Sequence, residues 1–181
     1  VNATGYGLTF GLHTRIDDRV QRVVERLRVG NAYVNRNQIG AVVGSQPFGG
    51  EGLSGTGPKA GGPQYLTRFT THGVAEAADD GAVTTEAAAL SALRRLRAAP
   101  TPVHAENLPG PTGESNRLSA YQRAPLLCLG PSAGAATAQA AAVAALGGLA
   151  VEAPGLPPDA LANLPVSGAL WWGDVARGRA Y

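Results

Sequence analysis

The residues best placed for chemistry form a loop of small and amide side chains, Gln38-Ile39-Gly40-Ala41. Gly40 has no side chain, so successive backbone N–H groups around it can converge on an anion. The residues alone favour a plainer alternative, in which Gly40 serves a tight turn and Phe48 is a core residue. The pattern by itself therefore leaves an anion site and a structural turn both open.

The single cysteine, Cys128, lies in the apolar run APLLCLG with no His or Lys nearby that could lower its pKa. Such a setting predicts a buried structural thiol and not a nucleophile. One cysteine also excludes an internal disulfide framework and fits a reducing compartment. The histidines at positions 13, 72 and 104 are scattered without ligand spacing, so no metal site is predicted.

Two glycines, Gly130 and Gly134, follow that apolar run and open a helical pattern. A glycine-rich turn before a helix can bind phosphate at the helix N-terminus. This one lacks both the G-x-G-x-x-G spacing of dinucleotide sites and a later acidic residue. Close helix packing is the preferred interpretation, and no cofactor-binding residue is predicted in this chain.

The composition sets the class of protein. The chain has 181 residues, 44% of them hydrophobic, 15% charged, and a net charge of +2. That charge is too small to indicate nucleic acid binding. The arginines are interpreted as residues on solvated faces of helices. No apolar run is long enough to span a bilayer and no signal peptide opens the chain, which together favour the cytoplasm. The chain begins without Met and inside a motif, so we expect a fragment of a longer protein.

The first 34 residues predict a parallel crossover unit. Residues 6–14 read as a buried strand, and Asp17 or Asp18 can cap the helix that follows. Four apolar residues of that helix recur at i, i+3, i+4 and i+7, namely Val20, Val23, Val24 and Leu27. Gly30 stands where a C-cap glycine belongs, and residues 32–34 form the next strand. A strand, a helix and a strand with short joints imply parallel strands in an α/β sheet.

The rest of the chain divides at about residues 71 and 110. Residues 71–109 are rich in alanine and are interpreted as an exposed connector, with a helix from a Thr84 or Thr85 cap to Ala99. Residues 110–181 predict a second module: strands at 126–129, 149–151 and 168–172, and helices at 133–146 and 159–164. This βαβαβ order is typical of a Rossmann-like half.

The segment from Gly30 to Phe69 also carries a family resemblance. A Y-V-N strand is followed by PFGG and then by G-x-S-G-x-G, which resembles the C-terminal signature of the aldehyde dehydrogenase superfamily. The longer string NRNQIGAVVGSQPFGGEGLSGTGPKAGGPQYL resembles the dehydrogenase half of the bifunctional proline utilization A family, and GPTGE at 110–114 resembles the opening of that family's C-terminal domain. The implied fold is α/β: residues 1–70 end an aldehyde dehydrogenase catalytic domain, and 110–181 form an incomplete Rossmann-like domain, truncated at both ends.

The resemblance implies an NAD-dependent L-glutamate γ-semialdehyde dehydrogenase of proline catabolism, which acts on a small-molecule substrate. Gly40 and Ala41 match its aldehyde anchor loop, and Phe48 matches the aromatic wall beside the aldehyde chain. The family's nucleophilic cysteine and general-base glutamate lie upstream of this chain, so we expect the fragment alone to be inactive. The resemblance also implies FAD in a separate proline dehydrogenase domain, a homo-oligomer, and peripheral contact with the inner membrane through that domain. The alternative is a non-catalytic assembly or binding module derived from the same fold.

Overall fold

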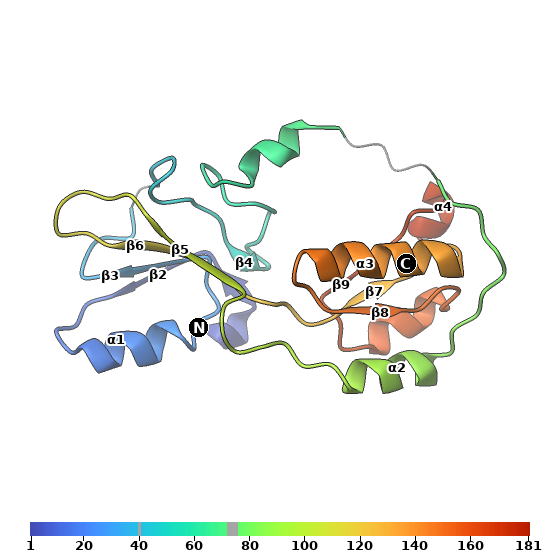
Figure 1. The fold of residues 1–181 in the computed structure, drawn as a ribbon. Helices are drawn as coiled ribbons and strands as arrows, with labels where there is room; N and C mark the ends of the chain where they lie inside the picture. The colour runs from blue at the N-terminus through green and yellow to red at the C-terminus, as the bar shows by residue number, and fades with distance from the viewer. Residues whose placement is uncertain (40, 72–75) are drawn as a thin grey trace. The chain divides into compact units, whose positions relative to one another are not determined.

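The computed structural model describes residues 1–39, 41–71 and 76–181. The chain divides into two compact units, Val1–His72 with Glu106–Leu118, and Gly73–Ala105 with Ser119–Tyr181. Both combine helices with small sheets (Figure 1), so the mixed α/β prediction is confirmed. The boundaries at residues 70 and 110 stay predictions.

The first unit contains the predicted crossover. β2 (Thr9–Leu12) and β3 (Asn31–Val34) pair in parallel, with Thr9 opposite Asn31, and α1 (Asp17–Val24) connects them. The predicted single strand over residues 6–14 is wrong, because it divides into β1 (Tyr6–Gly7) and β2. β1 pairs antiparallel with β4 (Glu51–Gly52). The PFGG-containing segment is thus attached to the first strand of the chain.

Two details of α1 differ from the prediction. Its N-cap is Ile16, and Asp17 and Asp18 occupy the first turn, where their charges favour the positive end of the helix. The helix ends at Val24, well before Gly30. The Asn2 side chain explains this early end, since it donates to the Arg26 carbonyl (2.6 Å) and accepts from the Arg28 N–H (2.9 Å). Gly30 is therefore not a helix cap.

Short elements complete this unit. η1 (Asn2–Thr4) and η2 (Tyr65–Phe69) are 3₁₀ turns. β5 (His104–Leu108) and β6 (Asn116–Ala120) pair with each other, and residues 106–118 of this pair belong to the first unit. The GPTGE motif lies in the connection between these two strands.

The second unit is built on a parallel sheet with strand order β8-β7-β9. Its strands are β7 (Leu126–Cys128), β8 (Ala150–Glu152) and β9 (Gly168–Leu170), and its helices are α3 (Ala133–Ala145), η3 (Pro158–Asn163) and α4 (Val175–Gly178). The predicted order of strands and helices is confirmed, with η3 as a 3₁₀ helix. Ser132 caps α3 by accepting from the Ala135 N–H at 3.1 Å.

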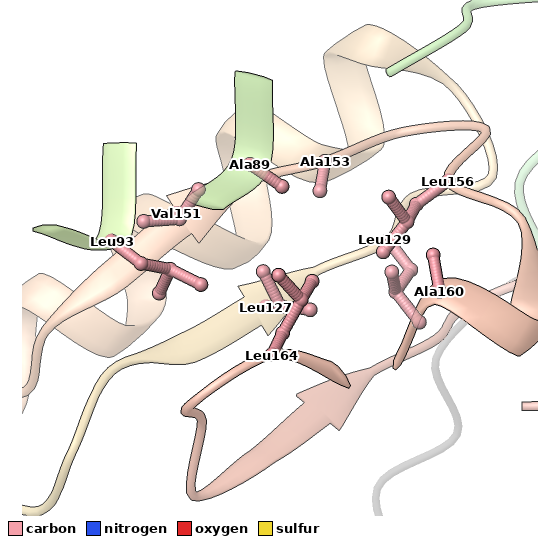
Figure 2. Packing of buried hydrophobic residues seen from close by; sticks show 9 residues of the cluster. All are labelled: Ala89, Leu93, Leu127, Leu129, Val151, Ala153, Leu156, Ala160 and Leu164. Atoms are coloured by element: carbon pink, nitrogen blue, oxygen red, sulfur yellow. The ribbon is translucent and has the colours of Figure 1, made fainter. Parts of the chain in front are cut away.

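Alternation along the strands assigns the two faces of this sheet. Leu127, Leu129 and Val151 pack into the main apolar cluster, together with Leu156 and Leu164 (Figure 2). Cys128 and Glu152 point the other way because successive strand residues face opposite sides. That other side is covered by α3, whose Thr137 hydroxyl donates to Glu152 at 2.7 Å.

α2 (Glu86–Arg94) covers the cluster face, and here the expectation of an exposed connector is wrong. Ala89 and Leu93 are buried in the cluster, with Leu90 and Leu96 partly buried against it. The Thr85 cap is confirmed, since its side chain accepts from the Ala88 N–H at 3.2 Å. Within the described residues no helix is long and apolar enough to cross a membrane.

Candidate functional site

The loop that contains Ala41 closes on itself directly after this residue. The Gln46 N–H donates to the Val42 carbonyl (2.8 Å), and the Val42 N–H donates to the Gln46 carbonyl (3.3 Å). Gly44 turns the chain with φ +80°, in the left-handed region that favours glycine. Its N–H donates to the Gly61 carbonyl at 2.9 Å. The turn is therefore fixed both internally and against residues 59–62.

The predicted site residues fall on two neighbouring segments. Gly40 lies outside the described residues, while Ala41 is exposed and Ile39 is 81% exposed. Phe48 is half-buried and forms a backbone bridge with Ala60, with N–H to carbonyl distances of 3.0 and 2.7 Å. The Ala41 loop and the Phe48 segment thus lie along the same supporting strip, residues 59–62. Their roles in binding stay predictions.

Lys59 fixes the Phe48 segment from behind. Its ammonium donates to the carbonyls of Gly30 (2.5 Å) and Gly49 (2.7 Å), and to Asn31 Oδ1 (3.2 Å). Asn31 also donates to the Pro47 carbonyl (2.9 Å) and accepts from the Gly49 N–H (3.2 Å). Burial lowers the pKa of Lys59, against an opposing effect of Glu51. With all three donors engaged by the fold, Lys59 is a structural lysine and not a nucleophile.

This arrangement also explains Gly30. A Cβ at this position would come within 1.7 Å of the Gly49 carbonyl oxygen, so the backbones approach too closely for any side chain. Gly30 is needed for a long-range contact between β3 and the PFGG turn. Helix capping, as predicted from its position after the apolar stripe, is not its role.

The Glu114 carboxylate joins three polar side chains. Oε2 lies 2.8 Å from Arg36 Nη1, and Oε1 accepts from Gln46 Nε2 (2.6 Å) and Asn116 Nδ2 (3.0 Å). The hydrogen bonds from Asn116 and Gln46, helped by the Arg36 guanidinium, hold the pKa of Glu114 below its ordinary value. Arg36 and Gln46 flank the Ala41 loop, so this carboxylate connects the GPTGE motif to both ends of the loop.

A cavity of about 130 Å³ lies behind the loop. Its polar lining includes Asn31, Gln46, Lys59 and Arg117, whereas neither Ala41 nor Phe48 contributes to it. Gln46 is 9% exposed, and its Oε1 has no hydrogen-bond partner among the described residues. The size and polarity of the cavity suit a few water molecules, which could satisfy this oxygen.

Cys128 is fully buried in β7, on the face covered by α3. Burial, together with the Glu152 carboxylate opposite it on β8, raises the pKa of the thiol to about 11. A thiol with such a pKa is protonated at neutral pH and is a poor nucleophile. The predicted burial of this thiol is confirmed, while its purely structural role stays a prediction.

The N-terminus of α3 is the place where a parallel α/β unit would receive a phosphate. Here Asp80 Oδ2 accepts from the Ala133 N–H at 2.9 Å, so a carboxylate of the chain itself occupies this position. Gly130 is crowded as well, since a Cβ there would lie 2.6 Å from the Ser132 nitrogen. The described residues at this turn do not fit a dinucleotide phosphate, and a packing role is favoured. Those residues also contain no cluster of three or more side chains that could hold a metal ion.

Sequence reasoning missed the residues that position the loop, above all Lys59 and Glu114. One signal was present for each. Lys59 is the only lysine of the chain and stands within a glycine-rich stretch, and Glu114 ends a Gly-Pro-Thr-Gly turn. Neither signal identifies a partner, because Arg36 is 78 residues away from Glu114 in sequence.

Comparisons with known proteins agree with the resemblance drawn from the sequence. Residues 1–73 match the model of the aldehyde dehydrogenase family. The bifunctional protein PutA of Rhizobium meliloti is 41% identical over 99% of this chain and 17% of its own length. The 1-pyrroline-5-carboxylate dehydrogenase of Bacillus subtilis is 54% identical over 36% of this chain and 13% of its own length.

A solved structure of proline utilization A from Bradyrhizobium japonicum is 69% identical, covering 39% of this chain and 7% of that chain, with a TM-score of 0.38. This chain spans less than a fifth of the length of the curated relatives described above. The alignment with the Rhizobium protein extends over 214 positions, more than the 181 residues here, so that relative carries residues that this chain lacks. The resemblance to aldehyde dehydrogenases and to proline utilization A is confirmed.

Proposed function

We propose, from the match of residues 1–73 to the aldehyde dehydrogenase family model, that the chain is part of an enzyme that oxidises L-glutamate γ-semialdehyde to glutamate in proline catabolism. The observation that carries the proposal is the match to bifunctional PutA over 99% of the chain. The match of 36% of the chain to 1-pyrroline-5-carboxylate dehydrogenases of Bacillus species also supports it. NAD would be the hydride acceptor, and FAD would serve a separate proline dehydrogenase domain.

Within this enzyme the chain would contribute substrate binding and not bond chemistry. Aldehyde oxidation needs a thiolate that attacks the carbonyl and a base that activates water. Cys128 is buried with a raised pKa, so the thiolate would come from a part of the enzyme outside this chain. The chain alone should therefore produce no NADH.

The contribution of this chain would be an anchor for the α-carboxylate of the substrate. The N–H of Ile39 is engaged by Asn37 Oδ1 (3.1 Å), and that of Val42 is engaged by Gln46. An anion at this loop would be held by the N–H of Ala41, which lies between them in the sequence; Gly40, the other predicted anchor residue, lies outside the described residues. Ala41 is exposed, and Phe48 would form the apolar wall beside the aldehyde chain.

The test replaces Ala41 by Leu in the enzyme that carries this chain. A larger side chain should push the carboxylate away from the backbone, and one charge-assisted hydrogen bond is worth roughly 1.5–3 kcal/mol, or about 10- to 150-fold. We expect kcat/KM to fall by about that factor for glutamate semialdehyde and far less for a simple aliphatic aldehyde. Ala41→Ser should be mild, because it adds a donor without much bulk.

Val43→Phe provides the matched control, since Val43 is 85% exposed on the same loop and the larger side chain adds at least as much bulk as Ala41→Leu does. It should leave both substrates unaffected. If Ala41→Leu impairs both aldehydes equally, the loop is structural and the anchor assignment is wrong. If the wild-type enzyme does not oxidise glutamate semialdehyde at all, the alternative of a non-catalytic assembly module gains support.

A further inference from the structure

The carboxylate of Glu114 connects the two ends of the Ala41 loop. Arg36 precedes Ala41 by five residues and Gln46 follows it by five, and each donates to a different oxygen of Glu114, at 2.8 and 2.6 Å. The loop between them carries Ile39, Val42 and Val43, which are 81%, 54% and 85% exposed and gain little from packing. Besides the main-chain hydrogen bonds of Val42, Gly44 and Gln46, its conformation therefore depends on the residues that hold its ends.

Glu114 is itself fixed by the GPTGE motif. The Glu114 N–H donates to the Pro111 carbonyl (3.1 Å), and Gly113 adopts φ +86° in the tight turn between them. Asn116 Nδ2 donates both to Glu114 (3.0 Å) and to the Pro109 carbonyl (3.1 Å). A Cβ on Gly110 would lie 2.8 Å from Asn116 Nδ2, so this glycine leaves room for the amide. The motif thus presents one carboxylate in a fixed position.

Arg36 is held on its other side as well. Its guanidinium lies 5.4 Å from the centre of the Tyr33 ring, and Tyr33 is a buried residue of β3. A cation over an aromatic face is attracted by the ring, which restricts the guanidinium to one orientation. The start of the loop is therefore tied to the sheet and to Glu114 together.

From this geometry we infer that Glu114 is a positioning residue, which holds the Ala41 loop in the conformation that binds the carboxylate of the aldehyde substrate. The inference rests on the proposed function and extends it to the GPTGE motif. A loop fixed before substrate arrives binds more tightly, because less conformational freedom is lost on binding. The positive charge of the Arg36 guanidinium compensates the negative charge of Glu114. The carboxylate can therefore support an anion-binding loop without repelling the anion.

The kinetic test compares Glu114→Ala and Glu114→Gln in the enzyme that carries this chain. Glu114→Ala should raise KM for glutamate semialdehyde by about tenfold or more, the equivalent of one charge-assisted bond, while kcat changes less than threefold. A simple aliphatic aldehyde should be affected less than threefold in both parameters. Glu114→Gln keeps an acceptor for Gln46 and Asn116 but loses the ion pair, so its KM should lie between those of wild type and Glu114→Ala.

Asp79→Asn is the matched control, because Asp79 also forms an ion pair with an arginine, Arg177, at 2.7 Å in the second unit. This variant should leave both substrates unchanged. Equal effects of Glu114→Ala on the two aldehydes, or an unchanged KM for the semialdehyde, would overturn the positioning role while the proposed function stands.

A second readout is independent of activity. Hydrogen–deuterium exchange of peptides covering residues 37–46 should be faster in Glu114→Ala than in wild type, while exchange in β7 stays the same. If the wild-type enzyme does not oxidise the semialdehyde, the proposed function fails, yet faster loop exchange would still support the tether. Unchanged exchange in the loop would reject the tether whatever the enzyme oxidises.

Discussion

The buried amide of Gln139 offers a sharp test of the second unit. Gln139 is fully buried in α3, where its Oε1 accepts from the Gly130 N–H (3.1 Å) and its Nε2 donates to the Gly130 carbonyl (3.0 Å). Gly130 stands at the crowded turn between β7 and α3, with φ +92°. Replacing Gln139 by Leu keeps the volume approximately but removes both hydrogen bonds.

The two losses are not equal. The Gly130 carbonyl keeps a second donor, the Trp172 N–H at 2.9 Å, whereas the Gly130 N–H is left buried without its partner. A buried donor without an acceptor costs roughly 1–3 kcal/mol. We expect the free energy of unfolding of the second unit to fall by about that amount, which for a unit of roughly 100 residues corresponds to a Tm lower by about 4–24 °C.

The assay is urea and thermal unfolding of the chain followed by tryptophan fluorescence. Both tryptophans, Trp171 and Trp172, lie in the second unit, so the signal reports that unit alone. The matched control is Gln122→Leu. Gln122 is half-buried and also bridges backbone groups, Ala99 N–H (3.0 Å) and the Gly147 carbonyl (2.8 Å), but both hydrogen bonds are exposed, so water can replace them. It should change the free energy of unfolding by less than about 0.5 kcal/mol.

Gln139→Glu separates hydrogen bonding from packing. A protonated glutamic acid can reproduce both bonds to Gly130, but an ionised one places a buried charge against the Gly130 carbonyl. The pKa of this carboxyl should be raised in the folded state, so the variant should be close to wild type near pH 4 and lose stability as the pH rises. Wild-type stability of Gln139→Leu, or Gln139→Glu stability independent of pH, would refute the reasoning.

Two further predictions concern the same unit. The pKa of Cys128 is raised to about 11, so we expect its thiol not to react with a disulfide reagent at pH 8 until the chain unfolds. We also expect Cys128→Ser to leave kcat of the enzyme within about twofold. A loss of about a hundredfold would mean that the thiol acts in catalysis. The Ala133 and Ala82 N–H groups hold the pKa of the Asp80 carboxyl below its ordinary value. The ionised carboxylate therefore stabilises the fold above about pH 4, and this stabilisation is lost as the pH falls through the lowered pKa. Asp80→Asn should therefore lower Tm more at pH 7 than at pH 2.5, and an equal Tm difference at both pH values would contradict this assignment.

Local patterns were sufficient for much of the second unit. The strand around Cys128 and the Ala133 helix were predictable because their apolar runs and caps are contained within a few residues. The same holds for the Thr85 cap. The error about α2 was one of interpretation, because Leu90, Leu93 and Leu96 already formed an apolar edge at helical spacing. An edge of this kind indicates burial against a core more often than an exposed connector.

In the first unit the errors come from contacts distant in sequence. The early end of α1 depends on Asn2, whose side chain binds residues 24 and 26 positions away. Gly30 is explained by the Gly49 carbonyl and not by the helix before it. Periodicity cannot detect either contact, because both bring together segments that are separated by intervening structure.

The loop around Ala41 shows the same limit of prediction from local sequence, here for a proposed function. Ala41 and Phe48 could be proposed as site residues because a recognisable motif contains them, but a backbone anchor has no side-chain chemistry of its own. The selectivity of the proposed anchor would then reside in the groups that fix the backbone, which are Lys59 behind the PFGG turn and Glu114 at the ends of the loop. Glu114 belongs to a motif some 70 residues beyond the loop, which in the sequence reads as the start of a separate domain. If Glu114 positions the loop, the GPTGE segment is a functional part of the dehydrogenase site, and a substrate pocket assembled from residues 1–70 alone would be incomplete.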